Sequence, residues 1–574
     1  MANQSNIDYT RHSLSHLLAM AVLKKFPKAK LGIGPTIENG FYYDFLLPKP
    51  ITPDDLKEFE KEMRILIEKK LGFTGKKTTP AGTKKILKNQ PFKQELIKDF
   101  AKEKKQLTLY TTGHFTDLCK GGHVKNTAEI NPEAFTLTKI AGAYWKGNEK
   151  NPQLTRIYGV AFGTKKELDE YLAMQAEAEK RDHKKLGVEL GLFTTSELVG
   201  QGLPLFTPKG TVIRDMLERF IEQLNKEHGY QKIWIPHLAR PELYKTSGHW
   251  DKFQDNLFHI KGKGSEFVLK PMNCPHHTQI YASEARSYRD LPIRFFETTT
   301  VYRDEKSGEL GGLTRVRSIT QDDGHVFFRG DQLEQEFDII LSMQKNILEK
   351  VGLTDYWVSL SLRDPKNKKA YLGDDATWNK AERAMTALLQ KKKINFKPII
   401  GEAAFYGPKM DLMVRDSLGR EWQLSTVQLD LNMPKRFGLE YIDEQGKKQT
   451  PVMIHRAFMG STERFIGILI EHFAGAFPLW LAPVQITILT LNEKVSAYAN
   501  EIKKELEEKN IRVSLDDRNE SIGKKIRGAE LQKIPYAIII GEKEQQSKTI
   551  SIRARGKKDL GTMPFSDFLK KIEK

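Results

Sequence analysis

The alternation of hydrophobic and polar positions changes character twice along the chain. Up to about residue 185, segments with the period of an amphipathic helix alternate with short runs of period two. Between residues 187 and 480, strand-like runs rich in aromatic residues surround long helix-like segments at 212–228 and 332–351. The remaining residues alternate strand-like and helix-like segments regularly. These patterns predict an N-terminal α+β domain, a central antiparallel-sheet domain flanked by helices, and a C-terminal α/β domain.

A charged segment separates the first two regions. Residues 164–186 carry only a sparse apolar stripe, at Leu168, Leu172 and Met174, which is typical of an exposed connecting helix. We therefore predict four segments. They are residues 1–163, the connecting helix 164–186, the central domain 187–480 and the last domain 481–574.

The composition, 39% hydrophobic and 29% charged, is that of an ordinary globular protein. The longest apolar stretch, residues 473–484, contains two prolines and is shorter than the roughly 18–20 residues of a membrane span. Two cysteines exclude a disulfide framework, and no signal peptide is recognisable, so we expect a cytoplasmic protein with no membrane partner. The net charge of +18 favours a nucleic-acid partner, although lysine-rich composition alone explains it equally well.

Two central segments have the composition of a nucleotide site. Residues 303–317 contain Arg303, an acidic pair, a glycine-rich turn and Arg315. Guanidinium groups bind phosphate bidentately, and glycines let the backbone turn over a ligand. Residues 451–465 lead through a glycine turn into a predicted helix with Arg464 near its start, where backbone N–H groups favour an anion. Taken singly, the first segment is also compatible with an ordinary surface hairpin.

Each cysteine lies close to histidines in the sequence. Cys119 precedes His123 by four residues, and Cys274 is followed by His276 and His277. His12 and His16 are also four residues apart, on one face of a predicted helix. These residue types suit metal sites, but a buried apolar thiol beside hydrogen-bonded histidines is an alternative for each set.

Further runs make the pattern specific. They are GHW at 248–250, KPMNCP at 270–275, TQDD at 320–323, FYGPK at 405–409, WQ at 422–423, TVQLD at 426–430 and IHR at 454–456. Together with the two arginine segments, which match motifs 2 and 3, they resemble the class II aminoacyl-tRNA synthetases and, within that class, the threonyl-tRNA synthetases. The resemblance covers essentially the whole chain and is to the form that lacks a small N-terminal domain. Pro236 matches the proline of motif 1, a dimer-interface element.

The resemblance implies a threonine–tRNA ligase that uses ATP with Mg²⁺, L-threonine and tRNA(Thr), and that forms a homodimer. It implies that Arg303, Arg315 and Arg464 bind ATP. It also implies that Cys274, His325 and His455 bind one Zn²⁺ per subunit, and that His249 assists the transfer step. The implied substrate-binding residues are Met272, Gln321, Asp323, Tyr406, Lys409, Gln423 and Gln428.

Discrimination explains why such an enzyme would use zinc. An apolar pocket separates valine from its isostere threonine by only about a hundredfold, whereas a metal that binds the hydroxyl requires that group. Serine has the hydroxyl and lacks one methyl group, worth roughly 10–200-fold, so a second, hydrolytic site is expected.

The N-terminal region resembles the bacterial-type editing domain of the same family, which hydrolyses seryl-tRNA(Thr). By residue type alone its histidines and cysteine could equally bind zinc, but the resemblance implies hydrolysis without a required metal, with polar groups positioning a water molecule. The implied editing residues are His12, His16, Lys93, Asp117, Cys119 and His123.

The C-terminal domain resembles the anticodon-binding domain of this subgroup. Its candidate phosphate contacts, any of which could instead be solvated charge, are Arg512, Arg518, Lys524, Lys525 and Arg527.

Two residues depart from the family pattern. Ile319 replaces an expected phenylalanine, which predicts ATP binding weaker by about 0.5–1.5 kcal/mol. His276 replaces an expected glycine.

Two alternatives remain open, namely an RNA-binding regulator with the same fold and a ligase for serine or proline.

Overall fold

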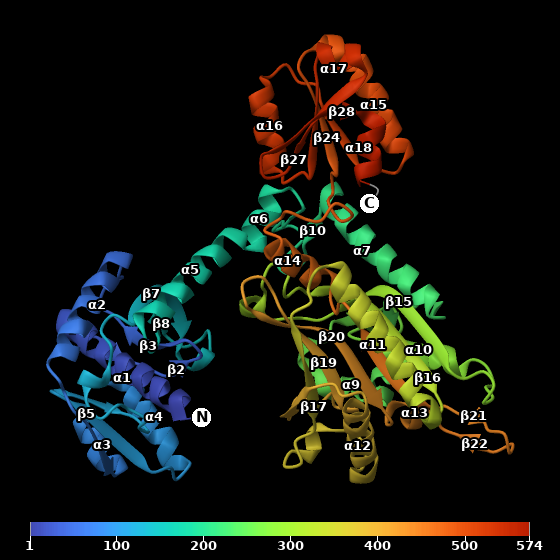
Figure 1. The fold of residues 1–574 in the computed structure, drawn as a ribbon. Helices are drawn as coiled ribbons and strands as arrows, with labels where there is room; N and C mark the ends of the chain where they lie inside the picture. The colour runs from blue at the N-terminus through green and yellow to red at the C-terminus, as the bar shows by residue number, and fades with distance from the viewer. Residues whose placement is uncertain (1, 573–574) are drawn as a thin grey trace. The chain divides into compact units, whose positions relative to one another are not determined.

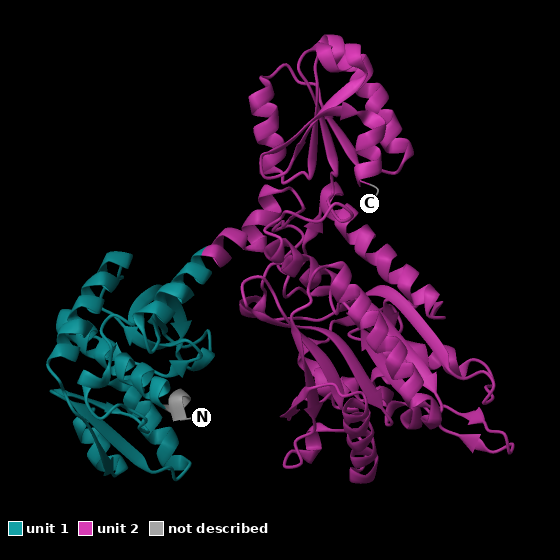
Figure 2. Cartoon of the chain, viewed as in Figure 1, with its two compact units in different colours: residues 1–176 teal, residues 177–574 magenta. Residues whose placement is uncertain are grey.

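The computed structural model describes residues 2–572. The chain forms two compact units, residues 1–176 and 177–574 (Figure 2). The division falls within helix α5 (Lys165–Arg181), in the predicted connecting segment. The finer division into four segments given above stays a prediction. Among the described residues, no helix combines the length and the apolar character required to cross a bilayer.

The first unit packs helices against two small antiparallel sheets (Figure 1). Its central helix α1 contributes Leu14, Leu17 and Leu18 to the core, where they pack with residues of α2 and β3. Helix α2 starts with a proline and a capping box formed by Thr52 and Asp55, which fixes its first turn. The elements that carry the site are α1 (Ala2–Lys25), β3 (Gly40–Leu46), α2 (Pro53–Glu68), α4 (Pro91–Lys102), β5 (Leu107–Thr112) and β6 (Phe115–Leu118).

The second unit contains an eight-stranded sheet in the order β11-β15-β16-β23-β20-β19-β17-β18. Adjacent strands are antiparallel except for the outer pairs β11–β15 and β17–β18. Helices α7, α11 and α14 cover one face of it (Figure 1). The bounds are α7 (Pro208–Glu227), β11 (Gln231–Lys232), β15 (Ile293–Tyr302), β16 (Ser318–Phe328), α11 (Leu333–Lys350), β17 (Tyr356–Leu362), β18 (Phe396–Ile400), β19 (Lys409–Arg415), β20 (Glu421–Asp430), β23 (Val452–Ala457) and α14 (Thr462–His472).

Alternation along the strands separates the two faces of this sheet. On β16, Val326 and Phe328 join the hydrophobic core beneath the helices. His325, the residue directly before Val326, therefore points to the opposite face. That face carries the candidate site, which lies beside a second hydrophobic cluster that includes Phe295, Phe327 and Met453.

The connecting segment differs from the prediction of a single helix. It consists of α5 and a second helix, α6 (His183–Glu189), separated by Asp182. The Asp182 side chain accepts a hydrogen bond from the backbone N–H of Lys184 at 2.9 Å, which is the role of an N-cap residue. The charged residues on both sides hide this boundary in the sequence.

The C-terminal domain has a five-stranded sheet in the order β25-β24-β26-β27-β28, whose first three strands are parallel. Helix α17 (Glu542–Ser547) and strand β28 (Lys558–Pro564) were not predicted, because both are short and polar. The other elements are β24 (Ile486–Thr490), α15 (Ser496–Glu508), β25 (Val513–Asp516), α16 (Ile522–Leu531), β26 (Tyr536–Ile540), β27 (Thr549–Ala554) and α18 (Phe565–Ile572).

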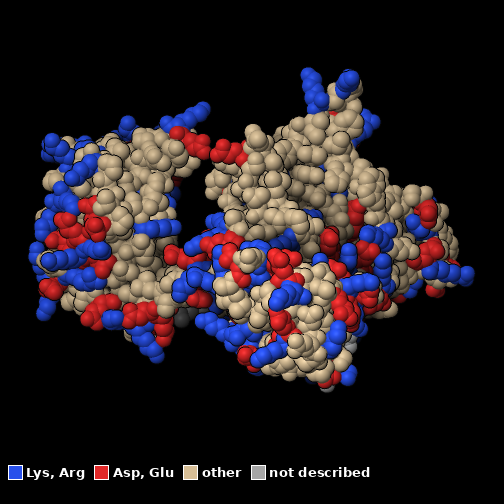
Figure 3. All heavy atoms as spheres, turned by 90° about the horizontal axis from the view of Figure 1, so that it is seen from above, with Lys and Arg blue, Asp and Glu red and all other residues tan. Residues whose placement is uncertain are grey.

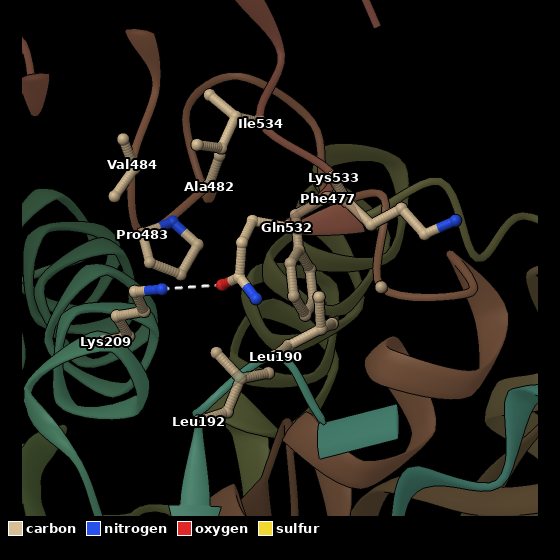
Figure 4. Close-up of a pocket in the computed structure, with 11 residues that line it drawn as sticks. Leu190, Leu192, Lys209, Phe477, Ala482, Pro483, Val484, Gln532, Lys533 and Ile534 are labelled. Atoms are coloured by element: carbon tan, nitrogen blue, oxygen red, sulfur yellow. Dashed lines mark hydrogen bonds between the residues drawn. The ribbon is translucent and has the colours of Figure 1, made fainter. Parts of the chain in front are cut away.

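A small cavity lies where this domain meets the central sheet domain (Figure 4). Lys209 of α7 donates to Gln532 Oε1 at 2.6 Å beside it. The cavity has room for about one water molecule, at about 20 Å³, so it is a packing defect and not a ligand site. The predicted fold classes of all three regions are confirmed.

Candidate functional site

A row of polar side chains crosses the open face of the central sheet. In the strand register, His325 of β16 lies opposite His455 of β23, which lies opposite Gln428 of β20. Gln428 in turn lies opposite Lys409 of β19. Directly opposed residues project from the same face of a sheet. Four residues predicted from remote stretches of sequence are therefore neighbours.

Cys274, the first residue of α10 (Cys274–Ala282), joins His325 and His455 in a cluster. All three are buried, and one candidate ligand atom of each lies within 4.8 Å of the others. His325 Nε2 and His455 Nδ1 are 3.1 Å apart. Two nitrogens on one tetrahedral metal ion, each at about 2.05 Å from it, would be about 3.3 Å apart, so the spacing suits such an ion.

The outer nitrogens of both histidines have partners of their own. Asp430 Oδ2 lies 2.9 Å from His455 Nε2, and His277 Nδ1 lies 2.8 Å from His325 Nδ1. A carboxylate beside Nε2 holds the His455 proton there and leaves the Nδ1 lone pair directed into the cluster. This is the outer layer of hydrogen bonds that accompanies metal-binding histidines.

Burial sets the protonation of the cluster. It holds the pKa of His325 well below the usual value, and the neighbouring histidines add to the effect. Burial also raises the pKa of the Cys274 thiol well above its usual value, with Asp323 and Asp430 contributing. Neutral imidazoles are the form that binds metals, and a thiol gives up its proton to a bound cation. The donor set therefore fits a divalent metal ion.

A buried carboxylate stands next to the cluster. Asp323 precedes His325 by two residues on β16 and shares its face, as does Gln321. Asn273 Nδ2 donates to Asp323 Oδ2 at 2.9 Å, and the other oxygen lies 3.8 Å from His325 Nε2. This carboxylate can accept hydrogen bonds from a cationic group of a ligand bound at the metal position.

Tyr406 closes the other side of the cluster. Its ring stacks on His455 with centroids 4.5 Å apart, and its hydroxyl donates to Gln428 Oε1. Lys409, the last residue of the row, is paired with Asp411 at 2.9 Å. The site therefore has polar side chains along the sheet and the aromatic ring of Tyr406 on one side.

A β-bulge brings Gln423 to the face of Gln428. The two are five residues apart, an odd spacing that would place them on opposite faces of a regular strand. However, β20 advances by three residues from Gln423 to Thr426, while the neighbouring β19 advances by two. The extra residue, at Leu424–Ser425, returns Gln423 to the polar face, where it is exposed.

Two of the predicted phosphate-binding arginines contact apolar side chains. Arg303 donates from Nη2 to Met272 Sδ at 3.1 Å, so the structure places these two predicted residues together. Arg464 is the third residue of α14, and its guanidinium lies 5.5 Å from the ring centroid of Trp422. Among the residues that the structure describes, the Nε atoms of both arginines have no hydrogen-bond partner, which leaves donor capacity for an anionic ligand.

Arg315 lies in the loop that joins β15 to β16. It is half exposed and pairs with Glu305 and with Glu309, each at 2.7 Å. It is thus held at the loop surface, apart from the buried cluster, in a position that solutes can reach.

His249 contacts the cluster directly. It starts α9 (His249–Phe253), is fully buried, and has Nε2 3.7 Å from Cys274 Sγ. Burial, assisted by His455 and Arg303, lowers its pKa to about 3. Its predicted part in the transfer step stays a prediction.

A second cluster with the same chemistry lies in the first unit. It consists of His12 and His16 on one face of α1, with Cys119 and His123. The His123 ring lies 4.1 Å from that of His12 and 4.4 Å from that of His16, between centroids. Cys119 Sγ is 3.3 Å from His12 Nε2 and 3.2 Å from His123 Nε2.

This second cluster borders a cavity of about 670 Å³, a size that admits a small ligand. In the cavity wall, Lys93 of α4 and Asp117 of β6 form a buried ion pair, with Nζ 2.7 Å from Oδ1. The Tyr43 hydroxyl donates to the same carboxylate. All six residues predicted for this region therefore lie in one neighbourhood.

Burial also keeps the second cluster neutral. It lowers the pKa of His123 to about 2 and that of His16 well below the usual value. It raises the pKa of Cys119 to about 11. The thiolate is the nucleophilic form of cysteine, so Cys119 at neutral pH serves as a hydrogen-bonding group.

Two of the basic residues suggested in the C-terminal domain serve the fold. Arg512 donates to backbone carbonyl groups that precede β24, and Lys525 is buried against a carbonyl of β24. Arg518, Lys524 and Arg527 are exposed. Acidic side chains are interspersed with basic ones over the face drawn in Figure 3, so that face offers scattered cations and not a continuous basic patch.

The orienting residues escaped sequence reasoning. Asn273, Asp430 and Tyr43 each bind a predicted residue and were given no role themselves, and His277, considered only as a possible metal ligand beside Cys274, contacts His325. Asp430 had a usable signal, because it continues the period-two series of Thr426 and Gln428 along one strand. The others offer none that separates them from ordinary buried polar groups.

Three family models match separate stretches of the chain. Residues 257–473 match the tRNA synthetase class II core domain (G, H, P, S and T), and residues 485–574 match an anticodon binding domain. Residues 107–158 match the threonyl and alanyl tRNA synthetase second additional domain.

Similar proteins cover nearly the full length. The threonine–tRNA ligase of Gloeobacter violaceus is 50% identical over 568 residues, which is 97% of this chain and 90% of the relative. That of Synechococcus elongatus is 48% identical, over 98% and 94%. Among solved structures, the RNA binding domain of threonyl-tRNA synthetase from Cryptosporidium parvum Iowa II has a TM-score of 0.65 and 35% identity, covering 68% of this chain and 98% of that one. Threonyl-tRNA synthetase ThrRS-1 from Aeropyrum pernix has a TM-score of 0.60 and 29% identity, covering 69% and 94%.

Proposed function

The chain belongs to the threonine–tRNA ligase family of class II aminoacyl-tRNA synthetases, and from this we propose how its residues divide the work. It is an ATP-dependent ligase that forms threonyl-adenylate and transfers threonine to the 3′ end of tRNA(Thr), and its first unit edits seryl-tRNA(Thr) by hydrolysis. The observation that carries the assignment of residues is the polar row on the central sheet, where two histidine nitrogens meet 3.1 Å apart beside a buried thiol.

In our proposal, Arg303, Arg315 and Arg464 bind the phosphates of ATP together with Mg²⁺. Charge builds up on the α-phosphate during adenylate formation, so fixed cations lower the barrier by electrostatic stabilisation and positioning. Arg315 exchanges its surface carboxylate partners for phosphate oxygens when ATP binds.

Cys274, His325 and His455 would hold a zinc ion. When bound, that ion offers open coordination positions to the amino group and hydroxyl of threonine. Asp323 accepts hydrogen bonds from the amino group, and the wall formed by Tyr406 shapes the space for the methyl group. Valine is rejected because it lacks the hydroxyl. The remaining pocket residues are Met272, Gln321, Lys409, Gln423 and Gln428, with His249 behind Cys274.

Serine satisfies the same ligands, which is why we assign editing to the cavity of the first unit. His12, His16, Cys119 and His123 position a water molecule against the ester. The Lys93–Asp117 pair fixes the opposite wall of the cavity. The neutral imidazoles can accept hydrogen bonds from that water and orient it towards the ester carbonyl, and the proton that the water loses ends on the ribose oxygen that leaves.

We also propose a cytoplasmic homodimer that binds tRNA through its C-terminal domain, with Arg518, Lys524 and Arg527 as phosphate contacts. Two exposed large apolar side chains support dimerisation, and one of them, Trp234, lies two residues before the motif 1 proline. Trp234 is 76% exposed, and Leu198 is fully exposed. Exposed apolar groups of this size are typical of protein interfaces. Light scattering would measure the mass directly.

Threonine-dependent ATP–pyrophosphate exchange tests the assignment, with serine and valine in parallel reactions. We expect exchange with threonine, weaker exchange with serine and very little with valine. No exchange with any amino acid would favour an RNA-binding regulator, and faster exchange with serine or proline would favour a ligase of that specificity.

A further inference from the structure

We propose that His183 is a positioning residue for amino-acid activation, because it ties the loop that carries Arg315 to the helix that carries Arg464. The proposal rests on the ATP-binding role proposed for these two arginines. His183 is the first residue of α6 and is only 2% exposed. It lies outside every sequence motif discussed above.

One ring nitrogen of His183 binds the loop between β15 and β16. Nε2 accepts a hydrogen bond from the backbone N–H of Leu313 at 3.0 Å. Leu313 is fully buried, and a buried backbone N–H that lacks an acceptor is costly. The imidazole therefore fixes the loop at this residue, two positions before Arg315.

The other ring nitrogen binds α14. His183 Nδ1 lies 2.6 Å from Glu471 Oε1, which also accepts the backbone N–H of His183 at 3.0 Å. Because Nε2 accepts from Leu313, the ring proton of the neutral imidazole must be on Nδ1, which then donates to Glu471. Glu471 lies near the end of the helix whose third residue is Arg464.

Two glycines let these parts approach. Gly312 has φ of +62°, and a Cβ there would lie 2.5 Å from His183 Nε2. On α14, a Cβ at Gly467 would lie 3.3 Å from Leu313 Cβ. Any larger residue would push the loop away from the imidazole or from the helix.

A metal ion is not the better explanation of this cluster. Asp182, His183 and Glu471 have ligand atoms within 4.8 Å of one another. However, Asp182 Oδ1 accepts from the N–H of Lys184, and the second oxygen of Glu471 pairs with Arg420 at 2.5 Å. The ligand atoms are already bound by protein donors, so the cluster is a hydrogen-bond relay.

Two amide replacements separate the two bonds. Asparagine places its amide near the Nδ1 position, so His183→Asn keeps a donor for Glu471 and loses the acceptor for Leu313. Glutamine reaches the Nε2 position, so His183→Gln keeps an acceptor for Leu313. In threonine-dependent exchange, we expect His183→Asn to raise the KM for ATP about tenfold and to leave the KM for threonine unchanged. We expect His183→Gln to restore most of the ATP affinity.

His472→Asn is the matched control. This neighbouring histidine of α14 also accepts a backbone N–H through Nδ1, from Ser417 at 3.2 Å, in the turn between β19 and β20. We expect its KM for ATP to equal that of the wild type. If His183→Asn does not fold, Gly312→Ala breaks the same bond from the loop side and should raise the KM for ATP similarly.

The proposal is overturned if His183→Asn, or Gly312→Ala in its place, leaves the KM for ATP unchanged, or raises both KM values equally. Failure of His183→Gln to recover ATP affinity would also overturn it. The wild type in the same assay tests the proposed function separately. An inactive wild type refutes that function. An active wild type whose KM for ATP is unchanged by His183→Asn refutes only the positioning role of His183.

Discussion

The two histidine–cysteine clusters offer the same types of candidate ligand, three histidines with a cysteine in the first unit and two with a cysteine in the central sheet, and they differ in what lies behind them. In the central sheet, Asp430 binds the outer nitrogen of His455. In the first unit, the outer nitrogen of His123 meets only the hydroxyl of Ser13, at 3.3 Å, and His16 Nδ1 has no hydrogen-bond partner among the residues described. Carboxylates behind histidines fix the tautomer and strengthen metal binding. The outer layer therefore separates the proposed metal site from the proposed hydrolytic pocket, which the types of ligand alone do not.

Exposure differs as well. Cys274 is fully buried, whereas Cys119 is partly exposed beside a large cavity. A closed cluster suits an ion that must be retained, and an open one suits a water molecule that must be exchanged.

The largest expected effect separates the two cysteines. Cys274→Ser removes a metal ligand and should lower kcat/KM for threonine-dependent exchange at least a hundredfold, while hydrolysis of seryl-tRNA continues. Cys119→Ser should affect only hydrolysis. Elemental analysis of both proteins should find zinc reduced in the first alone. A fully active, zinc-free Cys274→Ser protein would refute the metal assignment.

The buried ion pair of the first unit comes next. Lys93→Met leaves Asp117 buried without its cation, which should destabilise this unit by about 3–5 kcal/mol. Lys146→Met is the control, because its partners Glu95 and Asp99 lie at the surface and such pairs contribute about 0–1 kcal/mol. Hydrogen exchange of peptides from the first unit measures both. Equal protection in the two variants would contradict the prediction.

Asp430→Asn tests the outer layer itself. Asparagine keeps an oxygen for the backbone N–H groups of Asn432 and Met433, which Asp430 Oδ1 accepts, so the fold should survive. Its amide cannot accept from His455, and zinc affinity should fall about 10–100-fold in competition with a chelator. Ser13→Ala, the corresponding change in the first unit, should leave zinc content unaltered. Unchanged affinity in Asp430→Asn would show that the carboxylate is dispensable.

A further prediction concerns pH. The fold lowers the pKa values of His12, His16 and His123, so it favours their neutral forms. As the pH falls below about 6.5, these histidines take up protons in the unfolded chain before they do so in the folded one. The free energy of unfolding of the first unit therefore falls by up to about 1.4 kcal/mol per pH unit for each histidine. For His123 this loss continues towards pH 2.

Melting curves between pH 7 and pH 4 measure this slope. His16→Phe should reduce it, and His114→Asn, at an exposed turn, should not. A melting temperature that is independent of pH would remove the argument that these histidines are held neutral.

The sequence predicted which face of a sheet a residue occupies better than it predicted which remote residues come into contact. Polar residues at Gln321, Asp323 and His325 follow the period of a strand, so their common face could be expected. No spacing indicates that Cys274, His325 and His455 meet, because 51 and 130 residues separate them. Only the resemblance to a family supplied that set.

Two local interruptions of regular structure could not be predicted from the sequence either. Asp182 ends a helix within a uniformly charged stretch, and the bulge in β20 lies in an uninterrupted strand pattern. The cap at Asp182 is a local contact that the surrounding charged residues conceal, whereas the bulge depends on the pairing of β20 with β19, which a single segment does not specify. For the same reason His183 gave no sign of its two partners.

The bulge in β20 makes the rim of the proposed threonine pocket sensitive to the number of residues in the strand. Deleting one residue at Leu424–Ser425 would leave the strand's composition almost unaltered, yet would rotate Gln423 into the hydrophobic layer and Trp422 out of it. Point changes at the rim can only adjust one side chain at a time. An insertion or deletion there would change which side chains face the site along the whole strand end. A single such event could therefore alter the amino-acid preference more than a point mutation can.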